Sequence, residues 1–175
     1  LLNYLLTPFY VRVFMSDEYG QISELYAWIA LLLAVLTFGM ETTFFRFSQK
    51  EDSSRVFNNA ETFILLITTI FLVCYGLFYK SFAALIHYEY NTHYVLLLGI
   101  IVVLDAIAAI PFAMLRKENK AGRFSLIKTL NVLTNIAFNI LFLVVIPEKS
   151  LLIAEMIFGE NTSLLIWVFI SNILA

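Results

Sequence analysis

The sequence predicts an all-α polytopic membrane protein, a bundle of about six transmembrane helices. Of the 175 residues, 61% are hydrophobic and 14% are charged, whereas a soluble domain has about 25% charged residues. The apolar residues also gather in runs of roughly 20, the length that a helix needs to cross a bilayer. These runs lack the alternation and the short length of strands in a transmembrane barrel.

Four complete apolar runs are separated by charged loops. They cover residues 25–45, 60–79, 94–115 and 126–146. Partial runs lie at 1–14 and 163–175, where the chain begins without Met and ends within an apolar stretch. No basic segment or small-residue cleavage site marks a removable signal peptide. We therefore expect residues 1–175 to form a single transmembrane lobe that is truncated at both ends.

Basic residues alternate between the expected loops. The loop after 25–45 holds Arg46, Lys50 and Arg55, and the loop after 94–115 holds Arg116, Lys117, Lys120, Arg123 and Lys128. Lys and Arg remain on the cytoplasmic side of a membrane protein more often than not. The alternation predicts a multi-pass plasma-membrane protein whose basic loops and missing N-terminus face the cytoplasm.

Asp105 lies near the middle of the run 94–115. A central Asp costs about 2.5–3.5 kcal/mol to insert, so we expect this side chain to face protein or a water-filled cavity. Pro111 follows in the same run and removes a backbone donor, which predicts a kink. Two interpretations of Asp105 stay open. It either couples transport to a proton or sodium gradient, or it holds two helices together by a hydrogen bond.

Three asparagines recur every four residues within the run 126–146. Asn131, Asn135 and Asn139 therefore share one face of the predicted helix. Such a face either lines a hydrophilic cavity for sugars or bonds a neighbouring helix, at about 0.6 kcal/mol per bond. The sequence alone leaves both interpretations open.

Three charged residues lie near the expected ends of the spans. Arg12 is close to the outer end of the first span, where it either attracts a pyrophosphate or extends to the interface. Glu41 and Arg46, near the inner end of the next span, are little more than one helical turn apart. They either control the cytoplasmic mouth or form a structural pair.

No motif in the sequence indicates catalysis, a metal or a cofactor. His87, Glu89 and His93 do not have the spacing of a helical zinc motif, and a single Cys74 excludes a cysteine cluster. A membrane glycosyltransferase needs a large outer loop with clustered acids, and the outer loops here are short. The basic loops are explained by topology. We expect no enzyme activity, no metal, no cofactor and no nucleic-acid partner.

Three segments in order carry a family resemblance. They are residues 8–20 with Arg12 and the triplet Glu-Tyr-Gly, residues 39–47 (Gly-Met-Glu-Thr-Thr-Phe-Phe-Arg-Phe), and the basic loop 116–128. In sequence and spacing they resemble the polysaccharide-biosynthesis (oligosaccharide) flippases of the multidrug, oligosaccharidyl-lipid and polysaccharide exporter superfamily. The resemblance implies a two-lobed transporter, of which this chain forms most of the N-terminal lobe.

The resemblance also implies a function. Such a protein flips a polyprenyl-pyrophosphate-linked oligosaccharide from the inner to the outer leaflet by alternating access, for surface polysaccharide or lipopolysaccharide synthesis. The implied partners are this lipid-linked substrate, the bilayer of a bacterial inner membrane and the missing C-terminal lobe. The rival interpretation is an ion-coupled drug or small-molecule antiporter of the same superfamily, which would use an acid such as Asp105.

Overall fold

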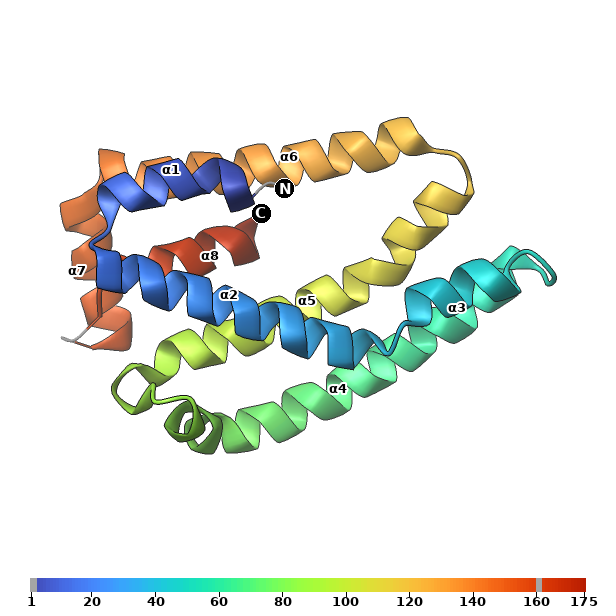
Figure 1. Ribbon diagram of the computed structural model, residues 1–175, viewed down its shortest axis with the longest axis horizontal. Helices are drawn as coiled ribbons and strands as arrows, with labels where there is room; N and C mark the ends of the chain where they lie inside the picture. The colour runs from blue at the N-terminus through green and yellow to red at the C-terminus, as the bar shows by residue number, and fades with distance from the viewer. Residues whose placement is uncertain (1–2, 160–161) are drawn as a thin grey trace.

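The computed structural model describes residues 3–159 and 162–175, and every regular element in them is a helix. This confirms the all-α prediction. The elements, drawn in Figure 1, are α1 Asn3–Val13, α2 Ser16–Thr37, α3 Met40–Phe47, α4 Ser53–Leu85, η1 Glu89–Asn91, α5 Thr92–Lys117, α6 Ala121–Ile140, η2 Leu141–Val145, α7 Pro147–Phe158 and α8 Ile166–Leu174.

Four helical stretches are long and apolar enough to cross a membrane. They are Ser16–Phe47, Ser53–Leu85, Glu89–Lys117 and Ala121–Val145. Apart from residue 146, they contain all four complete runs that the sequence predicts. The flanking helices α1, α7 and α8 are shorter, at 11, 12 and 9 residues. The protein is therefore an all-α polytopic membrane protein.

Helix α5 is the centre of the bundle and packs against α2, α3, α4, α6 and α8. Gly99 allows a close approach of α4, because a β-carbon at this position would lie 2.3 Å from the Tyr75 ring of α4. The Tyr75 hydroxyl donates a hydrogen bond of 2.6 Å to the Val95 carbonyl oxygen. Helices α4 and α5 are therefore held together by both ring packing and a polar contact.

The predicted run 25–45 is two helices rather than one. Helix α2 begins well before residue 25, where the Glu18 carboxylate accepts a hydrogen bond from the Met15 backbone N–H at 3.2 Å. It ends at Thr37 because Phe38 and Gly39 have φ angles of 48° and 64°. Left-handed residues of this kind terminate an α-helix. Helix α3 then starts in a new direction and packs against α4 and α5.

Pro111 does not interrupt α5, which is helical from Thr92 to Lys117. Figure 1 shows that the last turns of α5 run in a different direction from the first ones. A proline inside a helix removes one backbone hydrogen bond, and it is a common cause of such a bend. The change of direction carries the end of α5 toward the start of α6 (Figure 1).

The segment after α6 contains a helix that hydropathy did not predict. Helix α6 ends in the π-helical turn Leu141–Val145, where the Ile146 N–H donates to the Leu141 carbonyl oxygen at 3.0 Å. Pro147 then opens α7 at the first helical position, where proline is favoured because its missing donor is not needed. Helix α7 carries Glu148 and Lys149 in its first turn, which is why this segment reads as a loop in the sequence.

Three side chains connect α6, α7 and α8 around this turn. The Ser150 hydroxyl donates to the Phe142 carbonyl oxygen at 2.8 Å, and the Trp167 indole N–H donates to the Ser150 carbonyl oxygen at 3.0 Å. The Trp167 and Phe142 rings stack with centroids 4.1 Å apart. The C-terminal helices are thereby fixed against α6, which positions α8 for the site described next.

Candidate functional site

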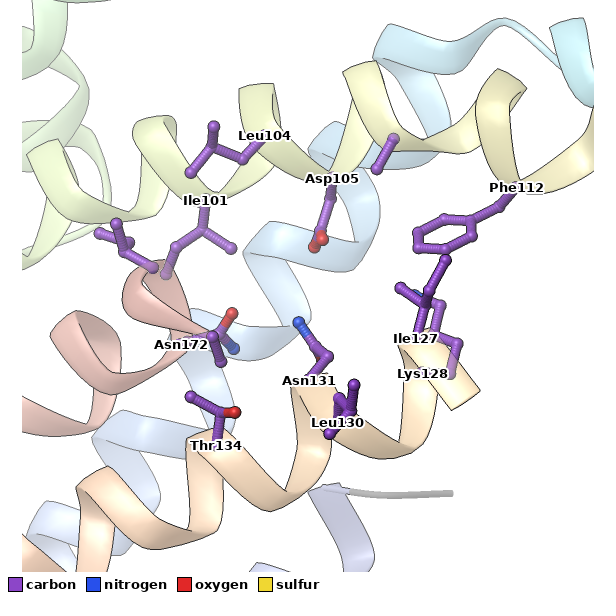
Figure 2. A pocket seen from close by; sticks show the side chains of 13 residues that line it. Ile101, Leu104, Asp105, Phe112, Ile127, Lys128, Leu130, Asn131, Thr134 and Asn172 are labelled. Carbon is purple, nitrogen blue, oxygen red and sulfur yellow. The ribbon is translucent and has the colours of Figure 1, made fainter. Parts of the chain in front are cut away.

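A polar cavity of about 420 Å³ lies between α5, α6 and α8. Its polar lining consists of Asp105 from α5, Lys128, Asn131 and Thr134 from α6, and Asn172 from α8. Figure 2 shows Asp105 directed into the cavity and the Asn131 amide directed toward it from the opposite helix. Apolar side chains, among them Ile101 and Leu104, complete the wall.

Asp105 lies near the middle of α5, on the side that the packed helices leave open. Its neighbours Val103 and Ala106 are buried, whereas the Asp105 side chain is exposed. The structure thus places this carboxyl group on the cavity, one of the two surroundings that we expected. Lys128 of α6 is the basic residue in the lining of the same cavity.

The three asparagines of α6 do not share one role. Asn139 is fully buried, and its amide donates to the Asn135 side-chain oxygen at 2.6 Å and to the Asn135 carbonyl oxygen at 2.9 Å. Its own side-chain oxygen accepts a hydrogen bond of 3.1 Å from the Tyr10 hydroxyl of α1. Asn139 therefore connects α6 to α1, Asn135 is bonded to Asn139 within α6, and Asn131 lines the cavity.

A second hollow of about 340 Å³ continues from the cavity toward the ends of α3 and α5. It shares Asp105, Phe112 and Lys128 with the first, and it adds Glu41 and Arg116. The Lys128 ammonium lies 4.2 Å from the centre of the Phe112 ring, an arrangement in which the ring face attracts a cation. Charged groups of both signs therefore line the passage between the cavity and the basic loops.

Glu41 forms a structural ion pair, but with Arg116 rather than with Arg46. The Glu41 oxygen and the Arg116 nitrogen are 2.6 Å apart. The Arg116 guanidinium also lies 5.6 Å from the ring centres of Phe45 and Phe124. Five residues of helix turn through about 500°, which directs Arg46 roughly 140° away from Glu41. Of the two interpretations of Glu41 and Arg46, the structural pair between them is not formed, because Glu41 pairs with Arg116.

Arg12 and Arg46 lie away from both hollows. Both side chains are exposed, and neither lines the cavity or its extension toward the basic loops. Of the predicted site residues, the structure brings Asp105 and Asn131 to the cavity and Glu41 to its extension. Asn135 is half-buried and is bonded to Asn139 within α6.

Sequence reasoning missed two polar residues of the cavity. Asn172 is the single amide in the apolar helix α8, and a polar residue in such a run is a signal that the sequence offered. Its amide donates to the Tyr26 hydroxyl at 3.0 Å. Thr134 lies three residues after Asn131 on α6, and so on the same face.

Within residues 3–159 and 162–175, no three His, Cys, Asp or Glu side chains gather as a metal site.

The fold and the cavity together define a class, a polytopic α-helical membrane protein with a polar cavity between its helices. The chain matches no known family model, no curated protein and no solved structure.

Proposed function

We propose that this chain is one lobe of a membrane transporter that moves a polyprenyl-pyrophosphate-linked oligosaccharide from the inner to the outer leaflet by alternating access. The observation that supports this proposal is the convergence of five polar side chains from three helices on one cavity. Polar groups inside a membrane are costly, and they commonly mark the path of a substrate. Amide, hydroxyl, carboxylate and ammonium groups can together bond the many hydroxyls of a glycan.

The proposal includes an orientation and a partner. The basic loops face the cytoplasm of a bacterial inner membrane, so the hollow that contains Glu41 and Arg116 opens on the cytoplasmic side. A C-terminal lobe of the same protein supplies the other wall of the pathway. The exposed apolar side chains of α6, such as Leu126 and Leu133, are available for lipid or for that lobe.

The decisive experiment uses the full-length protein in its native host. The gene is deleted, the polyprenyl lipids are extracted, and the accumulated species are identified by mass spectrometry. We expect a lipid-linked glycan to accumulate and to disappear when the gene is expressed again. Normal lipid levels with intact surface glycan, in a host without a second copy of the gene, would contradict the proposal.

Asp105 favours a second candidate, an ion-coupled antiporter of small molecules. An exposed carboxyl on a cavity inside the membrane can carry a proton or a sodium ion between the two sides. In proteoliposomes of the full-length protein, Asp105→Asn should abolish the pH dependence of transport. If this variant keeps the wild-type pH profile, Asp105 does not couple transport to protons. The transported compound then distinguishes the antiporter from the flippase.

A further inference from the structure

A second kind of hollow lies between α1 and α2, separate from the polar cavity. It measures about 370 Å³, and its lining includes Tyr10, Tyr19, Ser23, Tyr26 and Ala27. Figure 1 shows α1 and α2 diverging from the turn that joins them. We refer to this hollow as the tyrosine groove.

The sequence of α2 explains the shape of the tyrosine groove. Tyr19, Ser23, Tyr26 and Ala27 are separated by four, three and one residues, so they lie on one side of the helix. Ser23 has a small side chain and lies between Tyr19 and Tyr26 along the helix, and Ile22 and Ala27 complete the lining from α2. The groove therefore combines large aromatic rings with a small residue between two of them.

Two of the rings are held in place by contacts outside the groove. Tyr10 is bonded to Asn139 through its hydroxyl. The Tyr26 ring packs against Phe169 with centroids 5.8 Å apart, and its hydroxyl accepts the hydrogen bond from Asn172. Rings that are fixed before a ligand arrives lose little conformational entropy when it binds.

The groove also retains capacity for hydrogen bonds. The Tyr26 hydroxyl is the acceptor in its bond with Asn172, so its own hydrogen is not used in that bond. Among the described residues, the Tyr19 hydroxyl has no hydrogen-bond partner, and the Ser23 hydroxyl donates to the Tyr19 carbonyl but can still accept. Aromatic faces combined with free hydroxyl groups suit a ligand that is apolar on its faces and polar at its rim.

A pyranose ring has this chemistry, with C–H groups on its faces and hydroxyls at its edge. We propose that the tyrosine groove is a subsite for a sugar ring of the transported glycan. This inference rests on the proposed function and adds a place for the sugar. Asn172 lines the polar cavity and bonds Tyr26, which lines the groove. The Asn172–Tyr26 bond therefore lies between the two spaces.

The test measures binding to the purified full-length protein in lipid nanodiscs with two probes, polyprenyl pyrophosphate carrying a disaccharide and the same lipid without sugar. Tyr19→Phe removes one hydroxyl from the groove and keeps the ring. We expect it to weaken binding of the glycosylated probe about three- to tenfold, the loss of one hydrogen bond, and to leave the sugar-free probe unchanged. Tyr90→Phe is the matched control, because the Tyr90 side chain is 91% exposed and lies outside the groove.

A second variant, Ser23→Leu, fills the groove between the rings. Selective loss of the glycosylated probe at an unchanged thermal transition supports the sugar subsite. Equal losses for both probes, with a lowered thermal transition, would show instead that another helix packs in the groove. Wild-type affinity for both probes in Tyr19→Phe overturns the inference and leaves the flippase proposal intact. Failure of wild-type protein to bind either probe removes both.

Discussion

Helices α5 and α6 follow each other in the chain and both contain polar residues at mid-span, yet their surroundings differ. In the most apolar stretch of the span that contains α5, 50% of the residues are buried. In the most apolar stretch of the span formed by α6 and its π-helical end, only 11% are buried. Helix α5 contacts five other helices, whereas α6 packs chiefly on α8 and on its own π-helical turn. The difference indicates that the role of a polar or small residue depends more on the neighbouring helices than on its spacing along its own helix.

The largest expected effect is on the packed helix. Gly99→Ala places a methyl group against the Tyr75 ring, where the gap is too small. We expect it to lower the free energy of unfolding by about 1–3 kcal/mol, the usual cost of overpacking. Gly122→Ala on α6 is the control, because a β-carbon there meets nothing within 4 Å. Unfolding in detergent micelles measures both, and equal stabilities would contradict the comparison.

The one buried asparagine of α6 is expected to behave like a residue of the packed core. Asn139→Leu leaves the buried Tyr10 hydroxyl without its acceptor, which should cost about 1–2 kcal/mol. Tyr10→Phe removes the same bond from the other side. Because both variants break one interaction, their effects on stability should not add in the double variant. Simple additivity would show that the contact between α1 and α6 carries no coupling energy.

A smaller effect is expected at the end of α5. Glu41→Gln removes the charge that pairs with Arg116, but the two side chains are 43% and 40% exposed. Exposed ion pairs contribute about 0–1 kcal/mol and weaken as salt is added. Unfolding in low and high salt should therefore give a small loss that disappears at high salt. A loss of several kcal/mol would indicate that this pair is shielded from water in the assembled protein.

The smallest effect on stability is expected at the cavity. Asn131→Ala removes a side chain that has no hydrogen-bond partner among the described residues, so the unfolding free energy should change by less than about 0.5 kcal/mol. Transport of the lipid-linked glycan should nevertheless fall. Leu133→Ala, also on α6 but outside the cavity lining, should leave transport unchanged. If Asn131→Ala destabilises the protein while transport per folded molecule persists, Asn131 connects helices as Asn139 does.

Hydropathy predicted the spans because bilayer thickness fixes their length. It missed the break at Phe38 and Gly39, since a left-handed pair within an apolar run leaves hydropathy unchanged. It also missed α7, whose first turn carries Glu148 and Lys149. Helices are recognised by average composition, whereas their ends depend on individual backbone angles and caps.

The site was predicted only in part, for a related reason. Asp105 could be singled out because a carboxyl at the middle of a span is costly wherever the helix packs. The different roles of Asn131 and Asn139 depend on where α1 and α8 lie, and one helix pattern contains no such information. The pairing of Glu41 with Arg116 joins residues that are distant in the chain, and it follows from the packing of α3 against α5.

The π-helical turn Leu141–Val145 positions Phe142 against α7 and α8. A π turn accommodates one residue more than an α-helical turn does, and each residue turns a helix by about 100°. Deleting one residue here would convert the turn to regular α-helix and rotate Phe142 relative to α7 and α8. Phe142 would then lose its contacts with Ser150 and Trp167, which fix α8 beside the cavity that Asn172 lines. The shape of the cavity wall thus depends on the length of a segment that never touches it.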